Sequence, residues 1–247
     1  MRSSPLVILA AFVVSAVHSA VAQEDSASTP DRERRSALAW IVPVGIAASA
    51  VLDPEAREWA LHGHSRSLDH FAKSANRLGT TQVLVPAMAI TYVGAMLTHH
   101  EAQATGTFNT AAGYAAADLV ESVLKPLIGR ERPHVEGNSR RFHAFTGNGD
   151  WHSLPSAHVA HIAAIAATVS EQTHSTPISV AGDALVALVA WDRLYEDQHW
   201  ASDVTATIVL SALVSNATVR WLRSRQAHPA AAVEATTSAT ATSPTPR

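Results

Sequence analysis

The 247-residue chain is 47% hydrophobic, enough for a sizeable core, and has a formal net charge of −3 at pH 7. This weakly acidic balance, without a basic run interleaved with aromatic residues, argues against nucleic-acid binding. The chain has no cysteine, which excludes disulfides, cysteine-ligated zinc and a thiol nucleophile.

The first 22 residues have the pattern of a secretory signal peptide. Arg2 gives a positive start, residues 6–17 form an apolar core, and residues 20–22 read Ala-Val-Ala, a cleavage site. Residues 23–35 are polar and are expected to form a flexible leader. The pattern predicts an exported, periplasmic protein. The alternative is an N-terminal anchor that keeps the protein in the inner membrane, with its site facing the periplasm.

Residues 36–226 are predicted to form a helical domain, because strand signals are nearly absent. The expected helices cover residues 37–52, 54–59, 67–78, 81–98, 108–124, 155–170, 179–191 and 203–223. Seven of these segments are longer than ten residues, and we predict an all-α bundle of about six or seven helices. Residues 129–154, rich in Gly and Pro, are expected to form a long functional loop. Residues 227–247, rich in Ala, Thr, Ser and Pro, are expected to form a disordered tail.

The uncharged runs at residues 37–52 and 82–98 are at or below the lower length limit for a membrane span. The later helices carry acidic residues, among them Asp118, Asp183 and Asp203. The sequence therefore favours buried helices of a soluble bundle. Peripheral or integral membrane association is the alternative, and the sequence does not specify an oligomeric state.

Three segments carry groups suited to binding a phosphate. The first, residues 125–133, contains Lys125 and Arg132 where a helix gives way to the long loop. The second, residues 154–158, starts a helix, whose unpaired N–H groups and positive dipole end attract anions. The third, residues 191–203, contains Arg193, His199 and Asp203. Cationic side chains from these segments would surround one anion with charge-assisted hydrogen bonds.

Two histidines in these segments can provide the chemistry. If the third segment is helical, His199 and Asp203 share a face, and the carboxylate fixes which ring nitrogen carries the proton. The other nitrogen is then free to act as a base or a nucleophile. His158 and His199 would flank the anion, one as nucleophile and the other as acid, which are the parts that phosphoryl transfer requires.

In their order and spacing, Lys-x6-Arg-Pro, Pro-Ser-x-His and Arg-x5-His-x3-Asp resemble the signature of the type 2 phosphatidic acid phosphatase superfamily. That superfamily also contains bacterial acid phosphatases and vanadium-dependent haloperoxidases. The resemblance implies a helical bundle and hydrolysis of phosphomonoesters or lipid-linked phosphates through a phosphohistidine. It implies no metal or other cofactor, and vanadate would bind as a phosphate mimic.

The resemblance also implies a role for each matching residue. His199 is the nucleophile, Asp203 orients it, and His158 is the general acid. The implied phosphate ligands are Lys125, Arg132, Ser156, the backbone N–H of Ala157, and Arg193.

Two positions depart from the signature. Ala157 stands where the family usually has Gly, and it would be strained if the position needed a positive φ. Asp192 stands where the family usually has Ser, and its carboxylate could pair with Arg193 and weaken phosphate binding. The alternatives are a vanadium-dependent haloperoxidase, for which the chain is short, and a non-catalytic binder of phosphate or lipid headgroups. Arg130 lies outside the signature and is not assigned to the site.

Overall fold

The computed structural model describes residues 43–241, with side chains up to residue 226. The signal peptide and leader predicted for residues 1–35 lie outside the described residues. Apart from an isolated bridge between Arg130 and Phe142, the described part of the chain contains no β-structure, which confirms the all-α prediction.

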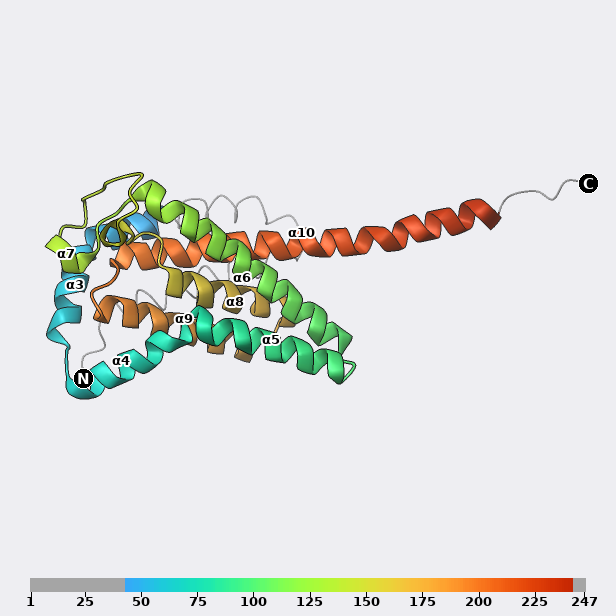
Figure 1. The fold of residues 1–247 in the computed structure, drawn as a ribbon, viewed down its shortest axis with the longest axis horizontal. Coiled ribbons are helices and arrows are strands. Elements are labelled where there is room, and N and C mark those ends of the chain that lie inside the picture. Colours follow the sequence, from blue (N-terminus) through green and yellow to red (C-terminus); the bar gives the residue numbers. More distant parts are fainter. Residues whose placement is uncertain (1–42, 242–247) are drawn as a thin grey trace, which may run out of the picture.

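The helices run back and forth between two ends of one bundle (Figure 1). In chain order they are α3 (Asp53–His62), α4 (Arg66–Leu78), α5 (Thr81–Leu97), α6 (Glu101–Ile128), α7 (Pro133–Glu136), η1 (Gly149–Trp151), α8 (Ala157–Thr173), α9 (Thr176–Tyr195) and α10 (Ala201–Ala241). Residues 43–51 are also helical. The long loop predicted for residues 129–154 contains only the short α7 and η1.

The core lies between α8, α9 and α10. Val159 on α8, Val189 on α9 and Ile208 on α10 belong to one buried cluster. Helix α6 packs closely on α8 and α10 at Gly113, where a Cβ atom would lie only 2.9 Å from Cγ2 of Thr168. This packing brings the C-terminal ends of α6 and α9 and the N-terminal ends of α8 and α10 together, at what we call the polar end.

Helix α5 does not pack as the core helix of a soluble bundle should. Only Ala95 is buried among its residues, while Ile90, Val93 and Leu97 are 73%, 53% and 76% exposed. The prediction of a buried helix is therefore wrong for α5. A helix that is apolar on all sides is typical of a protein core or of a membrane span, and α5 is not buried in the core of the described chain.

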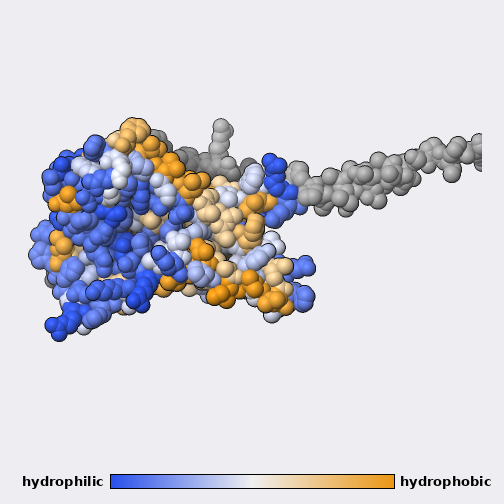
Figure 2. Space-filling model, in the orientation of Figure 1, coloured by the Kyte–Doolittle hydropathy of each residue, from blue (hydrophilic) through white to orange (hydrophobic). Residues whose placement is uncertain are grey.

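Apolar side chains gather on the surface away from the polar end (Figure 2). Helices α6 and α9 add to the exposed apolar residues of α5 with Phe108, Leu119, Val123, Ile178, Val180 and Leu185. By length and hydropathy, Ala201–Gln226 is the one helix of the described chain that could cross a membrane, although 67% of that window is buried. The bent pair of α4 and α5 passes the same test as a unit.

Helix α10 continues through residues 227–241, where we expected a disordered tail. Alanine, the strongest helix former, is frequent in this segment and favours the helix, whereas Pro229 and the Thr and Ser residues disfavour it. Residues 242–247 of the expected tail lie outside the described chain.

Candidate active site

The three segments singled out in the sequence meet at the polar end. Lys125 lies in the last turn of α6, Arg193 in the last turn of α9, and Arg132 just before α7. Burial lowers the pKa of both His158 and His199, and the positive charges of all three cations lower it further. Each cation is therefore close enough to act on both imidazoles. A cluster of three cations around two imidazoles is suited to binding a multiply charged oxyanion.

The ring of His199 is buried and is oriented by the backbone. Its Nδ1 lies 2.5 Å from the carbonyl oxygen of Ser153. Because a carbonyl oxygen only accepts hydrogen bonds, Nδ1 carries the hydrogen and Nε2 keeps a free lone pair. Burial, followed by the nearby cations, lowers the pKa of His199 well below its ordinary value. The neutral ring is therefore available as a nucleophile.

Asp203 does not hydrogen-bond to His199 directly, which corrects our expectation of a His–Asp pair on one helix face. The closest approach between the carboxylate and Nδ1 is 4.0 Å. The reason is that α10 begins at Ala201, so His199 precedes the helix. Oδ2 of Asp203 instead accepts a hydrogen bond from the Oγ of Ser153 at 2.5 Å. Asp203 thus acts on His199 through Ser153.

Arg130, which sequence reasoning left out, is a central part of this arrangement. Its Nη1 donates to Oδ1 of Asp203 at 2.6 Å, and its Nη2 donates to Oδ2 of Asp53 at 2.7 Å. Ser202 donates through both its backbone N–H and its hydroxyl to Asp53. The two carboxylates are 73 and 77 residues away from Arg130 in sequence, so no local pattern indicates these contacts.

Ser156 and Ala157 start helix α8 as predicted. Ser156 is the N-cap residue, but its side chain makes no capping bond, and within the described part of the chain its buried Oγ has no hydrogen-bond partner. Leaving a buried hydroxyl unpaired is unfavourable, so this oxygen is free to contact a bound anion. Ala157 is not among the residues with positive φ, so the strain considered for it does not arise.

Lys125 and Arg132 are each held by neighbouring groups. Lys125 Nζ donates to the carbonyl oxygen of Pro155 at 3.0 Å and forms an ion pair with Glu121 at 2.8 Å. Arg132 Nη1 donates to Oε1 of Gln198 at 2.5 Å. Burial is the main cause that lowers the pKa of both cations. Sequence reasoning missed Glu121 as a partner, although its i,i+4 spacing from Lys125 indicates the pair.

His158 lies in the first turn of α8 against the α4–α5 junction. A Cβ atom at Gly79 would lie 2.8 Å from the Cβ of His158, so glycine permits this close approach. Burial, and next the charge of Arg193, lowers the pKa of His158 to about 4. The ring is therefore neutral near pH 7 while the site holds no anion. A bound phosphate would favour its protonation, since an opposite charge stabilises the imidazolium.

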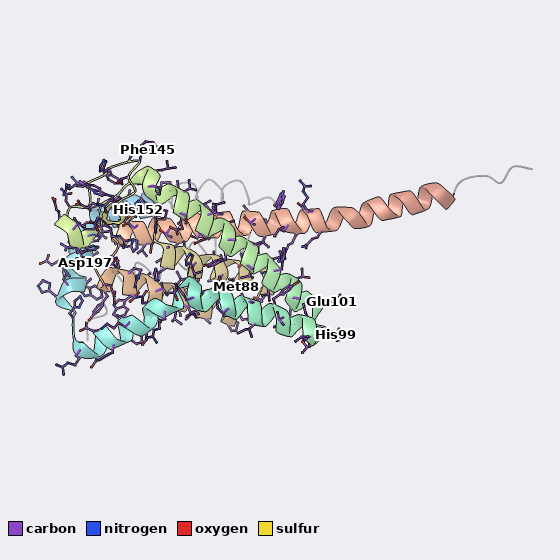
Figure 3. The ribbon with its side chains drawn as sticks, in the orientation of Figure 1. Met88, His99, Glu101, Phe145, His152 and Asp197 are labelled. Atoms are coloured by element: carbon purple, nitrogen blue, oxygen red, sulfur yellow. The ribbon has the colours of Figure 1, made fainter. Side chains whose placement is uncertain are left out.

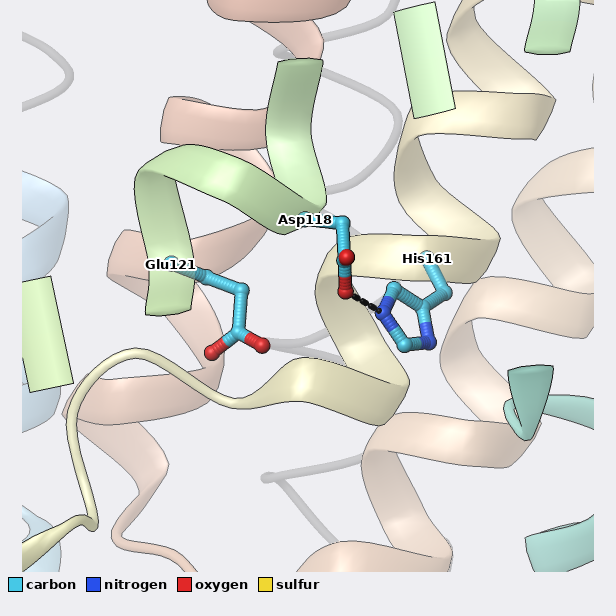
Figure 4. A group of neighbouring side chains, drawn as sticks. All are labelled: Asp118, Glu121 and His161. Atoms are coloured by element: carbon cyan, nitrogen blue, oxygen red, sulfur yellow. Dashed lines mark hydrogen bonds and ion pairs between the residues drawn. The ribbon is translucent and has the colours of Figure 1, made fainter. Parts of the chain in front are cut away.

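Asp118, Glu121 and His161 form a group of metal-ligand type next to Lys125 (Figure 4). Their ligand atoms lie within 4.8 Å of one another. However, His161 Nε2 lies 2.7 Å from Asp118 Oδ1, its Nδ1 lies 2.9 Å from the carbonyl oxygen of Gly79, and Glu121 pairs with Lys125. A divalent cation here would also lie beside the ammonium of Lys125. The group therefore fits a role in supporting Lys125 better than metal binding.

The adjacent histidines 99 and 100 are remote from the site. Figure 3 places His99 and Glu101 at the opposite end of the bundle from His152 and Asp197, which lie at the polar end. His100 Nδ1 bonds to the hydroxyl of Thr98.

Comparison with known proteins identifies a family and a similar fold. The family model described as "PAP2 superfamily" matches residues 106–227. The crystal structure of the first transmembrane PAP2 type phosphatidylglycerolphosphate phosphatase from Bacillus subtilis is 17% identical, with a TM-score of 0.58, covering 74% of this chain and 94% of that chain. The crystal structure of Aquifex aeolicus LpxE is 18% identical, with a TM-score of 0.55, covering 68% of this chain and 95% of that chain. No curated protein sequence matches significantly.

Proposed function

The chain belongs to the PAP2 superfamily, and we propose that it is a phosphatase that hydrolyses phosphate esters through a phosphohistidine at His199. The observation that carries the proposal is the orientation of His199. Its Nδ1 is held by the carbonyl oxygen of Ser153, which leaves Nε2 free. Burial, and next the charges of three nearby cations, lowers the pKa of this ring. Lys125, Arg132 and Arg193 supply the positive charge that a phosphoryl group needs, so the proposed reaction requires no metal ion.

In the first step, Nε2 of His199 attacks phosphorus and the bond from phosphorus to the ester oxygen breaks. The three cations, the hydroxyl of Ser156 and the N–H groups at the start of α8 hold the remaining phosphoryl oxygens. The leaving oxygen takes a proton from His158, which releases the alcohol. The proton reaches His158 when the phosphate binds, since the ring is neutral in the free protein.

In the second step, water attacks phosphorus and the bond between Nε2 and phosphorus breaks. His158, now neutral, accepts a proton from the water. Inorganic phosphate leaves, and His199 returns to its starting state. Ser153 and Asp203 hold the ring of His199 in the same orientation in both steps.

The surface supports a lipid-linked phosphate as substrate. The polar end carries the site, and the exposed apolar residues of α5, α6 and α9 lie along the rest of the bundle (Figure 2). Phe145, in the loop before η1, is 82% exposed at the polar end (Figure 3). Large exposed apolar surfaces mark contact with a membrane or another protein. We therefore propose that the protein associates with a membrane and that its site faces the periplasm, as the predicted signal peptide suggests.

The proposed activity is tested with purified full-length protein and an aryl phosphate in the presence of a chelator. We expect turnover that the chelator does not stop and that vanadate inhibits, and loss of turnover in His199→Ala with an unchanged circular dichroism spectrum. Chelator-sensitive activity, or full activity in His199→Ala, would refute it. Fractionation then shows whether the protein washes off membranes, and a panel of soluble and diacyl phosphate esters identifies the preferred class.

A further inference from the structure

The guanidinium of Arg193 already holds a carboxylate inside the site. Its Nε donates to Oδ2 of Asp192 at 2.8 Å, and its Nη2 donates to the same oxygen. The two side chains are 6% and 0% exposed, and Oδ1 of Asp192 has no hydrogen-bond partner among the described residues. The Nε–Nη2 edge of the Arg193 guanidinium is therefore occupied by the buried carboxylate of Asp192, the preceding residue of α9.

This edge is one of the two that a phosphate can use. Arginine binds phosphate most strongly through two parallel hydrogen bonds from adjacent donors, and the Nε–Nη2 pair is one such set. The Nη1–Nη2 pair is the other set. Nη2 carries two N–H groups, so the one on the side of Nη1 remains available while the other binds Asp192. A phosphate that binds Arg193 with two hydrogen bonds must therefore use the Nη1–Nη2 edge or displace Asp192 from the Nε–Nη2 edge. It must also approach a carboxylate of like charge.

We propose that Asp192 is a positioning residue that competes with the substrate phosphate for Arg193. It occupies the Nε–Nη2 edge of the guanidinium, and its negative charge offsets the attraction of Arg193 for a bound phosphate. The inference rests on the proposed function, because it takes Arg193 to be a phosphate ligand. Asp192 then sets the affinity for phosphate, and so KM, with little effect on the chemical step.

Protonation of Asp192 removes the competition. Burial and, to a smaller extent, the charge of Glu196 raise the pKa of Asp192 to about 6, against the lowering effect of Arg193. The carboxylate is therefore largely charged at pH 7.5 and becomes neutral as the pH falls through about 6. Anion binding should strengthen in the same range.

The other charged groups near the C-terminal end of α9 either pair with residues other than Asp192 or belong to the cation cluster of Arg193. From α3 and α4, Arg57 binds Asp197 and Asp69 binds Tyr195. From α10, Asp203 binds Arg130. The groups that share the cation cluster with Arg193 are Lys125 on α6, Arg132 before α7, His158 on α8 and His199 before α10.

The test measures binding of inorganic sulfate, a tetrahedral dianion that does not titrate near neutral pH, to the full-length protein by calorimetry. Asp192→Asn keeps the shape and removes the charge, and Glu196→Gln is the matched control for a nearby charge on the same helix. We expect Asp192→Asn to bind sulfate about tenfold more tightly at pH 7.5, the scale of one charge-assisted hydrogen bond. At pH 5 this difference should largely vanish, and Glu196→Gln should show a much smaller gain at pH 7.5.

Turnover of an aryl phosphate gives the second readout, in which Asp192→Asn should lower KM at pH 7.5 and leave kcat nearly unchanged. Unchanged or weaker sulfate binding in Asp192→Asn, or an equal gain in Glu196→Gln, would overturn the inference. If Asp192→Asn does not fold, Asp192→Ser makes the same test. The native protein must also bind sulfate more tightly at pH 5 than at pH 7.5, and a flat profile counts against the inference.

The binding assay separates this inference from the proposed function. Tighter sulfate binding in Asp192→Asn, with no turnover in any variant, would support the competition at Arg193 and refute the phosphatase. Normal turnover with sulfate binding that does not respond to Asp192 would refute the competition alone.

Discussion

The carbonyl oxygen of Ser153 lies 2.5 Å from Nδ1 of His199, and this contact leaves Nε2 as the nitrogen that is free to attack. A backbone group thus performs the task that the sequence pattern suggested for a carboxylate. Asp203 acts on His199 only indirectly, because it accepts a hydrogen bond from the hydroxyl of the same serine. This arrangement determines how much each residue should contribute to catalysis.

We predict that Asp203→Asn reduces kcat by about 10- to 100-fold. This loss is smaller than the roughly 10⁴-fold loss seen where a carboxylate alone fixes the histidine tautomer. The backbone carbonyl of Ser153 still fixes the tautomer in the variant, so only its support is weakened. Steady-state kinetics with an aryl phosphate measures the effect. A loss as complete as that of His199→Ala would contradict the indirect role of Asp203.

For His158, the effect of substitution should depend on the leaving group. An alkyl phosphate needs a proton on its leaving oxygen, whereas nitrophenolate leaves readily without one. Since general acid catalysis contributes about 10²–10⁴-fold, His158→Ala should slow alkyl phosphate hydrolysis at least tenfold more than nitrophenyl phosphate hydrolysis. The comparison uses kcat/KM for the two substrates. Equal losses would show that His158 is not the proton donor.

Glu121→Gln should shift the alkaline limit of phosphate binding to lower pH. Burial lowers the pKa of Lys125, and Glu121 opposes this effect. Without the carboxylate, Lys125 loses its positive charge at a lower pH, and the affinity for phosphate falls there. Competitive inhibition by inorganic phosphate across the alkaline range measures the shift.

Asp118→Asn is the matched control for Glu121→Gln, because Asp118 is on the same helix and contacts His161. Its profile should match that of the native protein. A shift of equal size in both variants would mean that the general loss of negative charge is responsible, and not the pairing with Lys125.

Arg130→Ala should destabilise the fold by about 3–5 kcal/mol, because it leaves two buried carboxylates, Asp53 and Asp203, without their shared cation. Arg140→Ala changes an exposed arginine of the same loop and should alter stability by no more than about 0.5 kcal/mol. Denaturant unfolding of both variants measures the difference. Similar stabilities would show that the buried network contributes little.

The spacing of the signature residues predicted the parts of the site that local structure determines. Lys125 near the end of α6, Ser156 at the start of α8 and Arg193 near the end of α9 follow from helix boundaries that Gly, Pro and periodicity indicate. The all-α class followed from the lack of strand patterns. In both cases the controlling interactions are between residues close in sequence.

The features that the sequence did not predict depend on contacts between distant segments. Ser153 meets His199 across 46 residues, and Arg130 meets Asp53 across 77. The exposure of α5 was also not predicted, because an apolar run has the same composition whether it faces a protein core or another apolar medium.

The most direct measurement is a rapid quench of the full-length protein with an excess of aryl phosphate, followed by mass spectrometry of an alkaline digest, in which phosphohistidine survives. Our account predicts one phosphoryl group on the peptide that contains His199, formed within the first turnover and missing in His199→Ala. A protein that turns over substrate with no phosphoryl group on this peptide, or with the group on another residue, would contradict it.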